Sequence, residues 1–317
     1  MTLVLFIGRR LAGVLTTLLV TSILIYAALA LAPGDPAAAL AGGTVPDPAR
    51  LAAIRAEYHL DDPFWTQYWH WLSGLLHGDL GTSLVYRSDV ADLLAGRTVN
   101  TLFLVVYAGV LIVVLGIGLG VLAGLRGGRT GTGVTIATTV AMGVPTFALA
   151  IVLIWVFATQ LSWLPIYGSG DTFPDKLRHL TLPAIALSFS YLAYVARITR
   201  QAVAGELRSE HVDTALSRGL PRRVVVRHHV LRNAMGPILT VSGTVVASLV
   251  AGTAVAEAAF GVNGLGSLLI QSAQRQDLAV VQILSMLMVG VFVVVNTCVD
   301  LANVALDPRI ARGDRSG

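Results

Sequence analysis

Residues 205–237 read GELRSEHVDTALSRGLPRRVVVRHHVLRNAMGP, a densely charged, arginine-rich insert between two apolar segments. Each flanking segment is close to the roughly 20 apolar residues that a helix needs to cross a bilayer. Within the insert, the sequence predicts one helix over 198–218, which Gly219 breaks. Pro221 suits the first turn of a second helix, predicted over 221–233. We therefore expect a pair of amphipathic helices that stands off the membrane.

The composition places the whole chain in a membrane. Of 317 residues, 55% are hydrophobic and only 13% are charged, with a mean hydropathy of +0.74, whereas a soluble domain has about 25% charged residues. Because backbone groups cannot stay unpaired in lipid, we expect an all-α polytopic protein with six transmembrane helices. The stretches free of Asp, Glu, Lys and Arg are Leu11–Ala32, Thr98–Leu125, Val134–Leu161, Leu180–Ala196, Asn233–Ala256 and Leu278–Val299.

Two of these spans carry residues that affect packing. Gly116, Gly120 and Gly124 stand at four-residue spacing in the second span, a pattern that predicts close approach of another helix. The fourth span is short and carries Pro183 near its start. The single cysteine, Cys298, excludes a disulfide framework, and we expect it to be a small buried hydrophobe.

The placement of the basic residues predicts the orientation. One set of loops and chain ends holds 15 of the 22 basic residues, and the opposite set holds 7. Because cytoplasmic loops carry the excess of lysine and arginine, we expect a multi-pass cell-membrane protein with both termini and the 198–233 insert in the cytoplasm. A cleaved signal peptide is disfavoured, because the first apolar run is longer than a signal's apolar region and five further spans follow.

The segment 33–97 is then an extracytoplasmic loop with four basic and eight acidic residues. It opens with Pro33–Pro36, a rigid turn. Amphipathic aromatic rings prefer the membrane interface, so the aromatic residues farther along predict a short helix there. These residues are Trp65, Tyr68, Trp69 and Trp71. The helix is either a membrane-surface anchor or a docking surface for an external partner, and the residues leave both open.

The chain lacks the residues of an energy-supplying or catalytic site. A Walker-type phosphate loop needs GxxxxGK[ST], and the only lysine, Lys176, lies in a Phe-Pro-Asp-Lys segment on the outer side. No His-Glu-x-x-His helix, metal-ligand spacing or GxSxG elbow is present, and the spans carry no midplane charges typical of a proton relay. We therefore expect a pore subunit with no catalytic residue, cofactor, metal or nucleic-acid partner of its own.

The first helix of the insert is amphipathic. At helical spacing stand the apolar Val212, Ala215 and Leu216, flanked by the charged Glu210, Asp213 and Arg218. Such a short helix is marginal by itself. The residues alone leave two interpretations open. Either the apolar face of this helix fits a groove on a partner protein, or the helix lies on anionic lipid.

A family resemblance bears on this choice. The stretches that carry it are Glu210–Leu220, Arg227–Ala234 and Pro237. Together they resemble the EAA loop of ABC importer permeases, and their residues are most similar to those of the dipeptide/oligopeptide/nickel family. Asp213-Thr214-Ala215 stands where the family's Glu-Ala-Ala triplet lies, and Gly219 matches its glycine. Leu216 and Ser217 replace the arginine and alanine that are more usual there.

The resemblance covers nearly the whole chain. Further segments similar to the family are Leu31–Pro36, Gln67-Tyr68, Gly78–Ser83, Asn100–Leu102, Glu257, Phe260, Gly264–Gly266, Leu268 and Asp307–Arg309. Asn263 departs from the family's usual proline. Each segment alone is a weak signal, but their order and spacing together are specific.

The resemblance implies a type I ABC importer permease fold. Residues 1–32 would form the N-terminus and first span, 33–97 a large helical extracytoplasmic loop, and 98–317 the permease core, with the coupling loop at 198–233. A second related permease would share the pore, two cytoplasmic ATPases would bind ATP and Mg, and an extracytoplasmic lipoprotein would deliver the substrate. We expect short peptides as the substrate, with nickel or glutathione as alternatives.

The resemblance also implies two sites. The expected ATPase-coupling residues are Glu210, Asp213, Thr214, Ala215, Leu216, Arg218, Gly219 and Leu220, with 214–216 filling a groove on the ATPase. The expected outer-gate or binding-protein contacts are Glu257, Phe260, Asn263, Gly264, Leu265 and Gly266. For this outer segment a short interfacial helix with flexible ends is the alternative. A secondary transporter or membrane scaffold is the alternative of a different class, although a secondary transporter normally shows midplane ionisable groups or broken helices.

Overall fold

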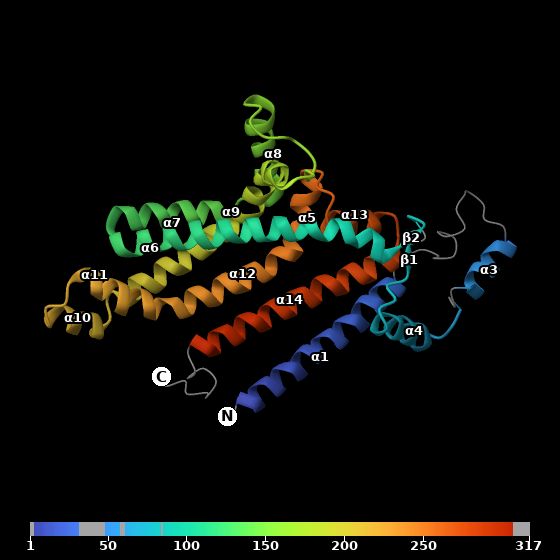
Figure 1. The fold of residues 1–317 in the computed structure, drawn as a ribbon, viewed down its shortest axis with the longest axis horizontal. Coiled ribbons are helices and arrows are strands. Elements are labelled where there is room, and N and C mark those ends of the chain that lie inside the picture. Colours follow the sequence, from blue (N-terminus) through green and yellow to red (C-terminus); the bar gives the residue numbers. More distant parts are fainter. Residues whose placement is uncertain (1–2, 32–47, 58–60, 84, 307–317) are drawn as a thin grey trace.

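The computed structural model describes residues 3–31, 48–57, 61–83 and 85–306, and these are almost entirely helical (Figure 1). The expected turn at Pro33–Pro36 and the C-terminal Asp307–Arg309 lie outside the described residues. Among these residues, five helices are long and apolar enough to span a membrane. They are α1 (Leu3–Ala30), the continuous α5–η1–α6 (Val90–Leu111, Ile112–Gly116, Ile117–Arg126), α9 (Phe173–Glu206), the continuous α11–η3–α12 (Arg222–Val225, Val226–Val230, Leu231–Ala259) and α14 (Leu278–Leu306). The all-α polytopic fold expected from the apolar stretches is confirmed.

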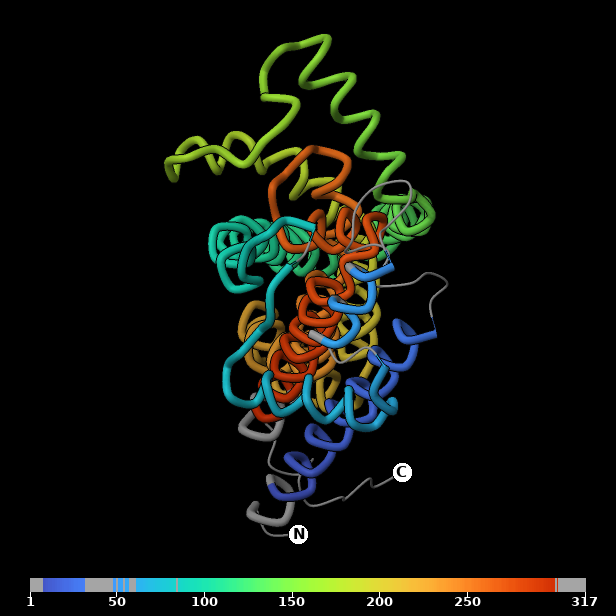
Figure 2. The backbone as a smooth tube through the Cα atoms, turned by 90° about the vertical axis from the view of Figure 1, so that its right-hand side faces the viewer, coloured from blue at the N-terminus to red at the C-terminus, as the bar shows by residue number. Residues whose placement is uncertain are grey.

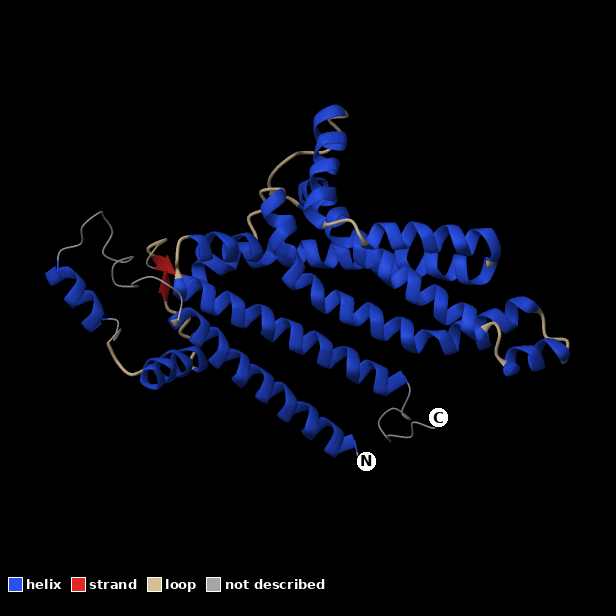
Figure 3. Ribbon diagram, turned by 180° about the vertical axis from the view of Figure 1, so that it is seen from behind, coloured by secondary structure: helices blue, strands red, loops and turns tan. Residues whose placement is uncertain are grey.

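The long helices run side by side, so the molecule has two ends. One end, called here the α10 end, holds α10 (Glu210–Ser217), α11, the first turn of α1 and the last turn of α14 (Figure 1). The opposite end, called the α4 end, holds α3 (Pro48–Glu57), α4 (Phe64–Leu76) and the short antiparallel strands β1 (Thr82–Ser83) and β2 (Ser88–Asp89), which are red in Figure 3. The main core lies among α5, α9, α12, α13 (Leu265–Gln274) and α14.

The third expected span, 134–161, is not one straight helix. It is divided into α7 (Gly128–Met142) and α8 with η2 (Thr146–Leu153, Ile154–Gln160), which are bent by 98° relative to each other. Figures 1 and 2 show the second half projecting away from the bundle. Pro145 causes the break, because its ring disfavours the helical conformation at Val144 and it has no N–H to donate. The Gly143-Val144-Pro145 signal was present in the sequence.

A serine on α9 contacts two backbone carbonyls at this break, of which that of Ala141 also accepts from the Val144 N–H at 3.3 Å. The hydroxyl Oγ of Ser190 lies 3.3 Å from the carbonyl oxygen of Ala141 and 3.1 Å from that of Val144. Backbone carbonyls inside a bilayer need such partners because no water is there to replace them.

We expect Ser190→Ala to lower the free energy of unfolding by about 1 kcal/mol, the usual contribution of one such hydrogen bond. The matched control is Ser188→Ala on the same helix, because the Ser188 hydroxyl bonds only the carbonyl of Ile185, three residues away. Thermal unfolding of the two variants in the same detergent measures the difference. Equal midpoints would contradict the role of Ser190.

The glycine stripe packs α6 against α9, as its spacing predicted. A Cβ at Gly120 would lie 2.5 Å from Cβ of Thr199 and 2.6 Å from the carbonyl oxygen of Ala196, and one at Gly124 would lie 2.8 Å from Cβ of Val203. Side chains larger than hydrogen do not fit between these helices. Consequently α6 supports the part of α9 that leads to the α10 end.

Two expectations about the spans are wrong, one about the length of the fourth span and one about the burial of Cys298. The fourth span is not short, because α9 runs for 34 residues and accommodates Pro183 in its interior. Its charged ends, which interrupted the apolar stretch in the sequence, are helical as well. Cys298 is exposed rather than buried, because it lies on a face of α14 that the other described helices do not cover.

The helix expected from the aromatic residues of the outer loop is α4, and one face of it packs on α1. The Tyr68 hydroxyl lies 2.8 Å from Oγ of Ser22, and the Tyr68 ring makes an edge contact with Tyr26 at 5.6 Å between centroids. Trp65 and Trp69 remain exposed on the other face. The α4 helix is therefore anchored to the first span through Tyr68.

Candidate coupling and outer-mouth sites

The insert that opened the sequence folds as a hairpin whose boundaries differ from those expected. The predicted helix 198–218 is divided, because α9 ends at Glu206 and α10 begins at Glu210. Ser209 lies between them in extended conformation, and its hydroxyl bonds the Glu206 carbonyl at 2.6 Å. Serine favours such breaks because its side chain competes for backbone groups. The predicted helix 221–233 is also wrong at its end, since it continues through α12.

The turn after α10 depends on Gly219. Its φ is +79°, in the left-handed region that glycine adopts without steric cost. Its N–H bonds the carbonyl of Leu216 at 2.9 Å, and the N–H of Leu220 bonds the carbonyl of Ala215 at 3.3 Å. These two bonds close the C-terminus of the helix. A Cβ at Gly219 would meet nothing within 4 Å, so a substitution there is strained only by the backbone conformation.

The buried face of α10 packs on the same chain rather than waiting for a partner. Val212 and Ala215 are 2% and 5% exposed. Their cluster is made with Val203 of α9, Val225 and Val230 after the turn, and Ala234 and Ile238 of α12. The expectation that Ala215 fills a groove on another protein is therefore not met in this conformation. Burial instead fixes α10 to the ends of α9 and α12.

A set of polar contacts around His211 strengthens this attachment. Its Nε2 lies 3.4 Å from Oε2 of Glu206, 3.3 Å from Oγ of Ser209 and 3.2 Å from Nδ2 of Asn233. These partners come from the end of α9, the turn before α10 and the beginning of α12. Consequently α10 cannot move as an isolated helix without breaking contacts to both long helices.

The outward side of the hairpin carries three large exposed apolar side chains among charges. We call Leu216, Leu220 and Val224 the exposed tip; they are 44%, 39% and 39% exposed. The expected coupling residues with exposed side chains are Glu210, Asp213, Thr214, Leu216, Arg218 and Leu220. Sequence reasoning missed Val224, although an apolar residue directly after Arg222-Arg223 was a usable signal.

At the α4 end, the carboxylate of one glutamate on α12 links this helix to α5 and to α13. Glu257, in the last turn of α12, is fully buried. It accepts a hydrogen bond from the Thr101 hydroxyl at 2.7 Å and another from the Ser267 N–H at 2.8 Å. Thr101 in turn accepts from the N–H of Leu265 at 2.8 Å. We call Glu257, Thr101, Leu265 and Ser267 the outer knot; it joins α5, α12 and α13.

The glycines beside Glu257 are required by close packing. A Cβ at Gly264 would overlap the Glu257 carboxylate, and one at Gly266 would lie 2.5 Å from Cα of Ala254. Phe260 and Leu268 are 1% and 0% exposed. The segment is a short helix, α13, whose first residues are packed into the core, so the flexible ends of the alternative interpretation are not seen.

Of the six residues expected to form the outer contact, only Asn263 exposes its side chain. Its Oδ1 accepts from Nε of Arg97 at 2.8 Å, and its backbone oxygen accepts from Nδ2 of Asn100 at 2.9 Å. Lys176 donates to Oδ1 of Asn100 at 2.5 Å. We call Arg97, Asn100, Lys176 and Asn263 the outer polar row. Arg97 and Lys176 were missed, although the chain's only lysine was a notable residue.

Comparison with known proteins agrees with this architecture. Residues 116–312 match the family described as "Binding-protein-dependent transport system inner membrane component", and residues 3–85 match "Binding-prot-dependent transport system membrane comp, N-term". A probable peptide ABC transporter permease protein of Sinorhizobium fredii is 36% identical over 309 residues, covering 96% of this chain and 98% of the relative. A glutathione transport system permease protein of Escherichia coli K12 is 34% identical over 306 residues, again covering 96% and 98%.

The matches therefore extend over the first span, the segment 33–97 and the core that contains the hairpin and the outer knot. Family members are membrane pore subunits of ABC importers that act with ATPase and substrate-binding components. The chain belongs to the binding-protein-dependent transport system inner membrane components, the permease subunits of ABC importers.

Proposed function

We propose that this chain is the pore-forming subunit of an ATP-driven importer of short peptides. It would work with a second related permease, two cytoplasmic ATPase subunits that bind ATP and Mg, and a substrate-binding lipoprotein outside. The peptide assignment is supported by a relative named as a peptide permease with nearly full coverage. Glutathione, itself a tripeptide, is the second candidate, because another relative is named as its permease.

The observation that carries the coupling proposal is one unbroken helix between the two sites. The α11–η3–α12 helix runs for 38 residues, from Arg222 beside the exposed tip to Ala259. At 1.5 Å per residue this is about 57 Å, long enough to cross the bilayer. Glu257 of the outer knot lies in its last turn. A displacement of the tip is thus transmitted along the helix to the outer mouth.

The mechanism that fits this arrangement is rigid-body alternation between inward-open and outward-open states. The ATPases would contact Leu216, Leu220 and Val224, with Glu210, Asp213 and Arg218 as surrounding charges. When they close on ATP, α10 would move together with the ends of α9 and α12, because Val212 and Ala215 are packed between them. The outer knot would carry that movement to α13 and α5.

The proposed orientation puts the α10 end in the cytoplasm. Eight arginines between 197 and 232 favour that side. The first turn of α1 and the last turn of α14 lie toward the same end as α10 (Figure 1), so the ends of the described chain share a side with the exposed tip. The outer polar row and α4 would then face the binding protein.

The test is to place a charge on the exposed tip. Leu216→Arg is expected to reduce co-purification of the ATPase subunits and ATP-dependent uptake of a labelled tripeptide in proteoliposomes, because a charge replaces an apolar contact. Leu76→Arg is the matched control for ATPase co-purification, since Leu76 is 76% exposed on α4 at the opposite end. Undiminished co-purification and uptake in Leu216→Arg would contradict docking at the tip. Uptake that needs no ATPase would favour a secondary transporter.

A further inference from the structure

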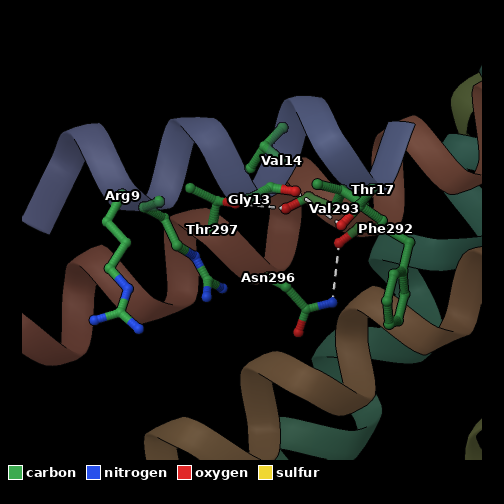
Figure 4. Close-up of a pocket in the computed structure, with 9 residues that line it drawn as sticks. Arg9, Gly13, Val14, Thr17, Phe292, Val293, Asn296 and Thr297 are labelled. Carbon is green, nitrogen blue, oxygen red and sulfur yellow. Dashed lines mark hydrogen bonds between the residues drawn. The ribbon is translucent and has the colours of Figure 1, made fainter. Parts of the chain in front are cut away.

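A cavity lies between α1 and α14 near the α10 end, away from both sites described above. Its volume is about 650 Å³, within the range of small-molecule sites. The α1 wall includes Arg9, Arg10, Gly13 and Thr17, and the α14 wall includes Phe292 and Asn296. Figure 4 shows the Arg9 and Asn296 side chains on the same side of α1.

One end of the cavity carries Arg9 and Arg10, and the rest of its lining combines the apolar Val14, Phe292 and Val293 with the polar Thr17, Asn296 and Thr297. Arg9 and Arg10 come directly after Gly8, the residue at which the apolar span of α1 begins. They are therefore at the edge of the hydrocarbon region, while Val14 and Phe292 continue the wall into it. A guanidinium matches a phosphate with two parallel hydrogen bonds. A molecule that carries a phosphate group next to an apolar chain fits this arrangement, with the phosphate at the arginines and the chain along Val14 and Phe292.

The helix that forms the α1 wall faces outward along most of its length. Within the apolar span Gly8–Ala30 only Ser22 and Tyr26 are buried, and Leu11, Leu15 and Leu19 are each more than half exposed. In a membrane these side chains contact lipid unless another subunit covers them. The α1 wall of the cavity therefore borders the lipid bilayer, where phospholipids are the most abundant molecules that carry a phosphate.

We propose that the cavity binds the phosphate of an anionic phospholipid, with an acyl chain along Val14 and Phe292. Basic pockets between transmembrane helices at the cytoplasmic side bind anionic headgroups in general. The assignment to the cytoplasmic leaflet rests on the orientation proposed above; the binding chemistry does not. A lipid bound there joins α1 to α14, which in turn packs against α12.

Two glycines of α1 offer a matched pair of variants. A Cβ at Gly13 meets nothing within 4 Å, and Gly13 lines the cavity. Gly8 has equally open surroundings but does not line it. Gly13→Leu therefore adds a side chain at a position that accommodates a Cβ and lines the cavity, and Gly8→Leu controls for added bulk. For charge, Arg9→Gln is compared with Arg129→Gln, another exposed arginine outside the cavity.

The experiment uses the assembled transporter in lipid nanodiscs with a trace of photoactivatable phosphatidylglycerol, and labelled peptides are identified by mass spectrometry. We expect labelling within residues 9–17 and 292–297. Arg9→Gln should reduce it about fivefold, the usual effect of one basic residue near an anionic membrane surface. Gly13→Leu should reduce it at least as much, and both controls should leave it unchanged.

Three labelling results would overturn the proposal: full labelling of Gly13→Leu, equal labelling by a phosphatidylcholine probe, or complete competition by inorganic phosphate. The last would indicate a site for a free small anion. A cross-link from the cavity to the second permease in place of lipid would also overturn it. Labelling needs neither ATP nor substrate, so a failure of the proposed transport function leaves this measurement unaffected.

Discussion

Gly219→Val is expected to reduce ATP-driven uptake about tenfold while membrane insertion and expression stay unchanged. The left-handed conformation at this position costs a residue with a Cβ about 1–2 kcal/mol, and a β-branched side chain tolerates it least. Because a Cβ there meets nothing within 4 Å, the strain acts only on the turn. The hairpin would relax and displace the exposed tip from the position in which an ATPase contacts it.

Two variants make this result specific. Gly219→Asn should retain most uptake, since asparagine adopts the left-handed conformation more readily than other residues. Gly205→Val tests added bulk on α9 nearby, because Gly205 also has open surroundings but no positive φ. The measurement is uptake at equal membrane content, together with the ATPase activity of the purified complex. Wild-type uptake in Gly219→Val would refute the role of the turn.

Glu257→Ala is expected to lower the thermal unfolding midpoint by several degrees and to abolish uptake. The substitution leaves the Thr101 hydroxyl and the Ser267 N–H without their acceptor in a buried site. Each unsatisfied buried group costs about 1–3 kcal/mol. The end of α12 would then detach from α13, so movement from the tip would no longer reach the outer mouth.

A graded series separates loss of the acceptor from loss of volume. Glu257→Gln keeps the shape and one acceptor oxygen, so its midpoint should lie between those of the wild type and Glu257→Ala. Glu210→Ala is the surface control for thermal unfolding, because Glu210 is exposed on α10. Thermal unfolding in detergent is compared across all variants, and uptake in proteoliposomes is compared across the wild type and the Glu257 variants. An unchanged midpoint in Glu257→Ala would show that the outer knot contributes nothing to stability.

Local rules predicted the elements whose causes lie within a few residues. Charge-free apolar stretches predicted five of the spans, and the spacing of Gly116, Gly120 and Gly124 predicted close packing of the second. The break after α10 was predicted from Gly219, and the aromatic outer helix from its tryptophans and tyrosine. The bend at Pro145 belongs to the same class, since Gly143-Val144-Pro145 is a local signal that the apolar composition concealed.

The errors occurred where burial by distant residues decided the result. Pro183 stays inside α9 because its neighbours Leu182 and Ala184 are packed in two buried clusters, one shared with α8 and the other with α5 and α12. The apolar face of α10 was expected to await a partner, yet Val203 and Ile238 cover it. Five of the six outer residues turned out to be buried, so only Asn263 remains available for contact at the surface.

The sequence by itself determined that this chain is a helical membrane protein, that its arginine-rich insert forms a hairpin, and that Gly219 closes α10. Those properties follow from apolar run length and backbone conformation, which are local. Only the tertiary structure decided that α10 is packed between α9 and α12 and that Glu257 meets Thr101, 156 residues away. The hydrophobic effect has no direction, so the partner of an apolar face, or of a buried carboxylate, is decided only when the helices assemble.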